Sequence, residues 1–252
     1  MNNYLKGFLI VAISTMAFMY LLKITARDPE FNVATFEDTP LQSGLLPLSQ
    51  GWTLAQTLNS AGSVRTLLVF AFDSESVTAV DLQSVGGGES DNPFVVLASV
   101  SEATLAELEA DKSLHQEFAF NTLLSVAGTA DQHLGIGTNF PEHADEAQSD
   151  SVFNFPKFGV ATPARTTVNW VENGLLDYEV ELCLRFDRPI RSVDDFDAAS
   201  KGFFLCGDFT ERATLLRLID TDNLDSGTGF SDGKSGPGFF PSGALLVIPH
   251  NW

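Results

Sequence analysis

Apolar and polar side chains alternate along several short runs of the chain, which is the period-two pattern of a strand with one buried face. RTLLVFAFD (65–73) and SVTAVDL (76–82) predict two strands joined by a short polar turn and followed by a glycine loop at 86–88. In SVSEATLAELEAD (99–111) the period changes, because Leu105 and Leu108 stand at helical spacing. Ser99 and Glu102 form a capping-box pattern, so we predict one amphipathic helix starting there.

The first residues carry a different pattern, an uncharged run from Gly7 to Leu22 bounded by Lys6 and Lys23. As a helix it would cover about 24 Å at ~1.5 Å per residue, slightly less than the ~30 Å hydrocarbon core of a bilayer. We expect residues 1–26 to be a single-pass membrane anchor, with a cleaved signal peptide or a buried helix as alternatives. The short N-terminal tail favours a domain outside the cytoplasm. The proline-containing segment 27–50 is predicted to be a linker.

Alternation is clearest in LLDYEVELCLRF (175–186), where apolar side chains share one face and acidic side chains share the other. Glu179 and Glu181 therefore point the same way, with their backbone positions roughly 7 Å apart. Asp208 ends a strongly apolar run in GFFLCGDFTER (202–212), where an uncompensated charge would be costly. Carboxylates without histidine or thiolate partners favour Mg²⁺, Mn²⁺ or Ca²⁺. A half-exposed strand with a polar outer face is the alternative.

A second candidate group lies in GTNFPEHADE (137–146). If this segment is helical, His143 and Glu146 share a face at spacing i, i+3. A carboxylate so placed can orient an imidazole and raise its basicity, as a general base requires. The same spacing also occurs on solvated helices without any chemical role.

Charge and cysteine content narrow the classes of partner. The chain has 33 acidic and 14 basic residues and a formal charge of −19, which repels phosphate backbones, so we expect no nucleic-acid partner. Cys183 and Cys206 show neither CxxC nor zinc-finger spacing, and we expect buried free thiols. A bridge between them would matter only in an oxidising compartment.

Five segments in order, GTNFPEHADE, FPKF, DYEVEL, GDFTER and DGKSGPGFFPSG, resemble the fumarylacetoacetate hydrolase family over residues 135–252. The resemblance implies a mainly β, α+β catalytic domain, a distorted β-sandwich that pairs as a homodimer. Residues 51–134 would form a small N-terminal α+β region. The family normally continues beyond the segment that ends this chain, so we expect a C-terminally incomplete domain with an unpaired sheet edge.

The resemblance also implies a site and an activity. The roles it assigns are metal binding by Glu179, Glu181 and Asp208, water activation by His143 with Glu146, enolate stabilisation by Lys234 in a glycine-rich loop, and binding of the acid substrate by Arg212 and Lys157. With Mg²⁺, or Mn²⁺ or Ca²⁺, such a site would hydrolyse a carbon–carbon bond of a 2-oxo or β-diketo acid. An isomerase, hydratase or decarboxylase of 2-oxo acids remains open, as does a non-catalytic, membrane-tethered binding domain.

Overall fold

The computed structural model describes residues 14–20, 45–140, 151–169 and 174–251. The chain divides into two compact units, Met1–Gly44 and Leu45–Trp252. In the first unit, residues 14–20 are helical. None of the helices described has the length and apolar character needed to cross a membrane. Most of the anchor predicted at 1–26 and of the linker predicted at 27–50 lies outside the described residues.

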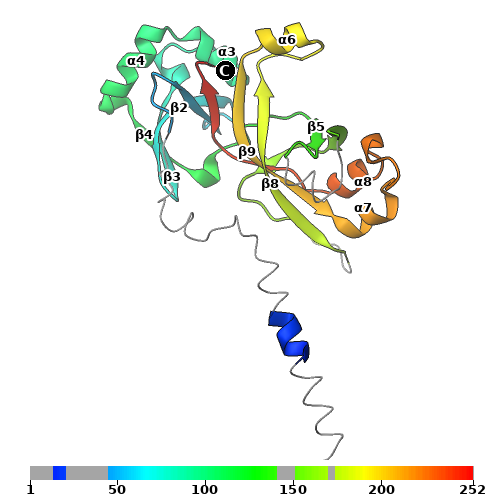
Figure 1. Ribbon diagram of the computed structural model, residues 1–252. Coiled ribbons are helices and arrows are strands. Elements are labelled where there is room, and N and C mark those ends of the chain that lie inside the picture. Colours follow the sequence, from blue (N-terminus) through cyan, green and yellow to red (C-terminus); the bar gives the residue numbers. More distant parts are fainter. Residues whose placement is uncertain (1–13, 21–44, 141–150, 170–173, 252) are drawn as a thin grey trace, which may run out of the picture. The chain divides into compact units, whose positions relative to one another are not determined.

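The second unit is built on a nine-stranded mixed sheet of order β4-β3-β2-β1-β11-β9-β10-β7, with β8 paired to β9 (Figure 1). Its strands are β1 Gly51–Leu58, β2 Val64–Phe72, β3 Ser76–Asp81, β4 Gln116–Ala119, β7 Thr162–Pro163, β8 Leu176–Phe186, β9 Lys201–Glu211, β10 Pro241–Ser242 and β11 Leu246–Pro249. A separate two-stranded sheet pairs β5 (Gln132–Gly137) with β6 (Phe153–Phe158). The strand-rich architecture expected after residue 135 is therefore present, and the sheet also includes strands from the region 51–134.

Helices are few and short. The α-helices are α3 Pro93–Ser99, α4 Glu102–Ala110, α6 Val193–Ala198, α7 Arg212–Leu218 and α8 Phe230–Lys234, and the 3₁₀ turns are η1 Leu82–Val85, η2 Lys112–Leu114, η3 Phe120–Thr122 and η4 Leu224–Ser226. With the mixed sheet they make an α+β fold. Figure 1 shows α3 and α4 beside β2–β4, and α7 and α8 beyond β8 and β9.

The two strands predicted at 65–73 and 76–82 are confirmed as the β2–β3 hairpin. The single helix predicted to start at Ser99 is wrong, because two helices, α3 and α4, meet there. Asn92 caps an earlier helix, α3, because its side chain accepts from the Phe94 amide and Pro93 pre-sets the first turn. Val100 is extended and separates the two helices. Ser101, not Ser99, caps α4 by accepting from the Thr104 amide at 3.1 Å.

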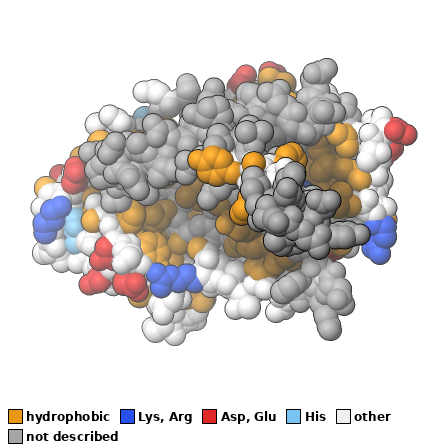
Figure 2. Space-filling model, turned by 60° about the horizontal axis from the view of Figure 1, so that its bottom comes forward, with side chains coloured by type: hydrophobic (Ala, Val, Ile, Leu, Met, Phe, Trp, Pro, Cys, Tyr) orange, Lys and Arg blue, Asp and Glu red, His pale blue; other side chains and the backbone are white. Residues whose placement is uncertain are grey.

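The apolar core lies on the sheet beneath α3 and α4. Its fully buried side chains include Leu54, Leu68, Leu82, Val96 and Leu246. The unpaired edge expected at the last strand is absent from the described structure, since β11 pairs with both β1 and β9. Apolar side chains also reach the surface, and Figure 2 shows them over the centre of one face, with charged side chains towards its margins.

Candidate active site

The site forms where β8 pairs antiparallel with β9. In this register Glu179 lies opposite Asp208, and Glu181 lies opposite Cys206. Tyr178 and Val180 point to the other side and are exposed, as the alternating sequence predicted. The three carboxylates predicted to bind a metal therefore stand on one face of one strand pair.

Two buried lysines bind this face. Nζ of Lys234 lies 2.7 Å from a Glu179 carboxylate oxygen and 2.5 Å from an Asp208 oxygen. Nζ of Lys157 donates to the other Asp208 oxygen and to the backbone carbonyl of Lys234, both at 2.5 Å. Both lysines are about 5% exposed, so their charges require these acceptors. Glu179 and Asp208 thus share one cationic partner.

Lys157 reaches the site from the two-stranded sheet. It lies in β6 with Phe153 and Phe155 on the same buried face, and these rings lie against β5 at Gly135 and Gly137. A β-carbon at either glycine would overlap the ring opposite it. The alternating glycines of the LGIG segment therefore allow the rings to pack closely, which fixes the strand that carries Lys157.

Lys234 is placed by a short helix. The sequence predicted a closing glycine-rich loop around Lys234, but residues 230–234 form α8, and Lys234 is buried at its last position. The Phe155 ring lies beneath its ammonium group, with Nζ 5.9 Å from the ring centroid.

Arg212 extends the charged network at the start of α7. Its Nε donates to Asp177 at 2.8 Å and its Nη2 donates to Glu179 at 3.1 Å. Glu211 fixes this helix start, because its carboxylate accepts from the amides of Ala213 and Thr214. Asp177 was not among the predicted site residues. Its place on the acidic face of the alternating run could have predicted that it lies beside Glu179. Arg212, predicted to bind substrate, is paired with these two acids.

Burial and ion pairing act against each other on these groups. Burial lowers the pKa of Lys157, and the neighbouring Asp208 charge opposes that shift. Burial alone would also lower the pKa of Arg212, but its hydrogen bond to Asp177 and the Glu179 charge leave it raised. The same pairing lowers the pKa of Asp177. Arg212 and Asp177 therefore carry full charges at neutral pH.

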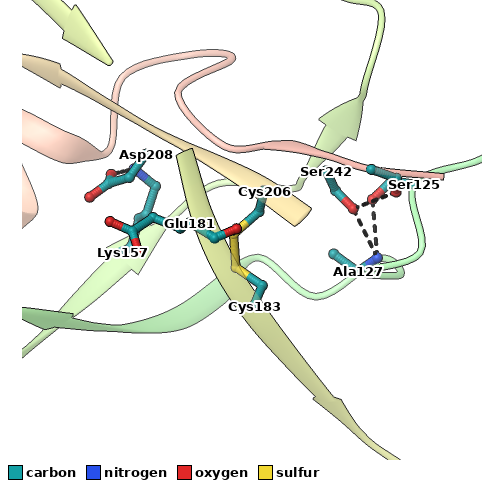
Figure 3. The surroundings of a disulfide bond; sticks show 9 residues. Ser125, Ala127, Lys157, Glu181, Cys183, Cys206, Asp208 and Ser242 are labelled. Atoms are coloured by element: carbon teal, nitrogen blue, oxygen red, sulfur yellow. Dashed lines mark hydrogen bonds and ion pairs between the residues drawn. A yellow bond between two sulfur atoms is a disulfide. The ribbon is translucent and has the colours of Figure 1, made fainter. Parts of the chain in front are cut away.

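The donor set is suited in its chemistry to a hard divalent cation, because carboxylate oxygens are the ligands such ions prefer. Glu179 and Asp208 already converge on a cation, the Lys234 ammonium group. Within the described part of the chain, no three acidic, histidine or cysteine side chains are grouped closely enough to hold a metal. In Figure 3 the Glu181 side chain points towards the side where Asp208 and Lys157 lie. A divalent ion would have to replace the ammonium contacts.

The remaining predicted catalytic pair, His143 and Glu146, lies outside the described residues. A shallow hollow of about 300 Å³ is lined by Leu48, Trp52, Glu102, Leu105, Ala106 and His250. It contains none of the predicted site residues, and its lining carries no paired charges. The charged network at β8 and β9 is therefore the candidate site.

The expectation of free thiols is wrong. Cys183 and Cys206 are joined by a disulfide, with their Cα atoms 6.0 Å apart (Figure 3). Both cysteines lie on the acidic face of the β8–β9 pair. Cys206 is directly opposite Glu181, and Cys183 is the next residue after Glu181 on that face of β8. Their shared face could be read from the alternation, but the bridge depends on the register between two strands, which the sequence does not display.

No protein-family model and no curated protein matches the sequence. Solved structures do match it. An HpcE-like protein from Mycobacterium smegmatis has a TM-score of 0.50 and 22% identity, covering 78% of this chain and 66% of that one. The chain therefore has the fold of that protein over most of its length. A fumarylacetoacetate hydrolase from the psychrophilic Exiguobacterium antarcticum has a TM-score of 0.46 and 16% identity, covering 79% of this chain and 66% of its own.

The resemblance to the fumarylacetoacetate hydrolase family that the five segments predicted is thus confirmed for the fold. At 22% identity the likeness concerns the fold alone. The chain spans 66% of the length of either matching structure. Activity, substrate and cation are therefore argued from the site itself.

Proposed function

We propose that this chain is a divalent-metal-dependent hydrolase that cleaves a carbon–carbon bond of a 2-oxo or β-diketo acid, similar to fumarylacetoacetate or an acylpyruvate. The observation that supports it is the meeting of Glu179, Asp208, Lys157, Lys234 and Arg212 in one ion-pair network. These residues come from β6, β8, β9, α7 and α8. Such a convergence of buried cations and carboxylates is typical of a site that binds a charged ligand.

Glu179, Glu181 and Asp208 would hold the cation, which is Mg²⁺, Mn²⁺ or Ca²⁺ in this proposal. When bound, the cation would polarise the keto oxygen of the substrate. Lys234 would then be free to donate to the enolate oxygen that develops as the carbon–carbon bond breaks. Lys157 and Arg212 would bind the acid group, since both are cations of this network, Lys157 beside Asp208 and Arg212 beside Glu179.

Water activation is assigned to His143, oriented by Glu146, on the resemblance of GTNFPEHADE to the family segment. The imidazole would accept the proton of the attacking water and later return it to the carbon leaving group. Because a filled pair at these positions suits hydrolysis, we place hydrolysis before the isomerase, hydratase and decarboxylase alternatives.

A non-catalytic binding domain is the second candidate, and one observation favours it. The ammonium groups of Lys157 and Lys234 already compensate Asp208 and Glu179. A site so balanced is stable without any divalent ion.

The deciding experiment uses the full chain with an acylpyruvate, with oxaloacetate as the second substrate, and Mg²⁺ or Mn²⁺ in the buffer. We expect pyruvate and a free acid from the acylpyruvate, and a loss of at least about 100-fold in kcat for His143→Ala with Mn²⁺ binding retained. Glu179→Gln should remove Mn²⁺ binding in calorimetry. His115→Ala is the matched control. The His115 ring bonds the Leu108 carbonyl and contacts none of the candidate site residues that the structure describes. Absence of turnover with wild-type protein would contradict the hydrolase, and absence of Mn²⁺ binding would contradict the cation site.

A further inference from the structure

The disulfide Cys183–Cys206 lies at the boundary between the apolar core and the charged cluster. Cys206 belongs to the buried core, and Cys183 packs against it. On the same face, the next cross-strand rows along β8 and β9 are Glu181 with Cys206 and Glu179 with Asp208. Because Cys206 is directly opposite Glu181, the bridge adjoins the first of the carboxylate rows.

The rows beyond the bridge are electrostatically unfavourable on their own. Glu179 and Asp208 face each other directly, and like charges at opposite positions of two strands weaken their pairing. Asp177 and Glu181 add negative charge on the same face of β8. The compensating cations Lys157, Lys234 and Arg212 all come from outside the strand pair, from β6, α8 and α7.

When a ligand draws the ammonium groups of Lys157 and Lys234 away, Asp208 and Glu179 lose the cations that compensate their charges. Until another cation replaces the ammonium groups, the repulsion between Glu179 and Asp208 would act to separate the strands that position them. A covalent tie close by would oppose that separation. The connection between the strands, residues 187–200 with α6 inside, joins them beyond Phe186 and Lys201, several rows away from Glu179 and Asp208.

We propose that the Cys183–Cys206 disulfide is a positioning bridge, which holds the β8 and β9 carboxylate rows in register when their lysine partners are withdrawn. The part concerning ligand binding rests on the proposed function, whereas the clamping of the strand pair does not. Because such a bridge persists in oxidising surroundings, the domain would work outside the reducing cytoplasm. The apolar run at 7–22 is an independent sequence feature, from which we also expect the domain to lie outside the cytoplasm.

The test compares the oxidised full chain with the same protein reduced by dithiothreitol, using amide hydrogen exchange. In the reduced protein we expect exchange at least about tenfold faster at residues 179–182 and 206–208, with β1 residues 54–56 unchanged. Cys183→Ala/Cys206→Ala should match the reduced form and show no response to dithiothreitol. Two titratable thiols in the untreated protein, unchanged exchange, or equal acceleration in β1 would each overturn the proposal. If the double variant does not fold, the reduced wild-type protein decides alone.

A second readout separates this inference from the proposed function. Mn²⁺ affinity should fall about tenfold on reduction if the bridge positions the ligands. If neither redox form binds Mn²⁺, the cation site fails, and the exchange experiment still decides whether the bridge clamps the strands. Equal Mn²⁺ affinity in both forms would refute a positioning role in ligand binding.

Discussion

Glu179 and Asp208 face each other across β8 and β9, and the ammonium group of Lys234 contacts both carboxylates, at 2.7 and 2.5 Å. Lys234 is buried, whereas the Glu179 and Asp208 side chains are 26% and 15% exposed. Two opposed carboxylates would repel each other. The shared ammonium therefore makes this strand pairing compatible with its charges.

Lys234→Met should destabilise the fold by about 2–3 kcal/mol, less than the 3–5 kcal/mol of a fully buried pair because both carboxylates retain some solvent contact. The loss follows from the uncompensated charge on Glu179 and Asp208, and urea unfolding at pH 7 measures it. Lys112→Met removes an exposed lysine and is the control, with no expected change.

The same variant tests the cation site without any activity assay. With the ammonium removed, Mn²⁺ should take its place, so the unfolding free energy of Lys234→Met should rise with Mn²⁺ concentration more steeply than that of the wild type. A flat response in both proteins would mean that these carboxylates do not hold a divalent ion.

Glu211 gives a pH-dependent contribution to stability. Hydrogen bonds with Thr214 and with the Leu175 amide lower its pKa from the ordinary 4.5 to about 2. A depressed carboxyl pKa stabilises the fold above the unfolded value, and the contribution disappears as the pH falls from 4.5 to about 2. Glu211→Ala should therefore be less stable than wild type at pH 7, and the two should converge by pH 2. A constant difference across this range in thermal unfolding would contradict the assignment.

Alternation along β8 was the strongest sequence signal, and it identified correctly which side chains share a face. That information is local, because strand periodicity belongs to the backbone itself. The position of β11 between β1 and β9 and the bridge between Cys183 and Cys206 depend on contacts remote in sequence. The break between α3 and α4 was missed because Ser99 and Ser101 both fit a cap.

The sequence predicted which residues form the site better than it predicted which of them contact one another. Glu179, Glu181 and Asp208 were expected to hold a metal, and Lys234 was expected to stabilise an enolate. In the structure Lys234 instead contacts the carboxylates of Glu179 and Asp208. An ammonium group and a divalent cation are recognised by the same oxygen atoms, so sequence cannot say which is bound. His143 and Glu146 remain predictions, since they lie outside the described residues.

Gly135 is predicted to be intolerant of even one methyl group. Its α-carbon lies against the Phe155 ring, so Gly135→Ala should cost about 1–3 kcal/mol through overpacking and should loosen the strand that carries Lys157. Phe155→Leu should recover part of that loss in the double variant, a coupling that thermal unfolding of the four proteins measures. Gly88→Ala, where the nearest atom would lie at 3.4 Å, is the control. If the stability losses of Gly135→Ala and Phe155→Leu simply add in the double variant, the contact with the Phe155 ring is not the cause of the Gly135→Ala loss.

The family resemblance led us to expect a homodimer, and the outer face of β8 and β9 is the surface we expect to form its interface. Val180, Leu182 and Leu205 are 73%, 59% and 63% exposed there, and Leu182 lies directly opposite Leu205. Exposed apolar side chains that adjoin one another are typical of an interface. The acidic side chains of β8, which would repel a second copy of a chain with formal charge −19, lie on the opposite face.

We predict that the wild-type protein is a dimer in light scattering coupled to gel filtration, and that Leu182→Lys shifts it to the monomer because a buried ammonium would lack a partner. Leu216→Lys changes a leucine that is 70% exposed on α7 and should leave the dimer intact. Circular dichroism should show that both variants fold. A monomeric wild-type protein, or dissociation by both substitutions alike, would exclude the β8–β9 face as the contact between copies.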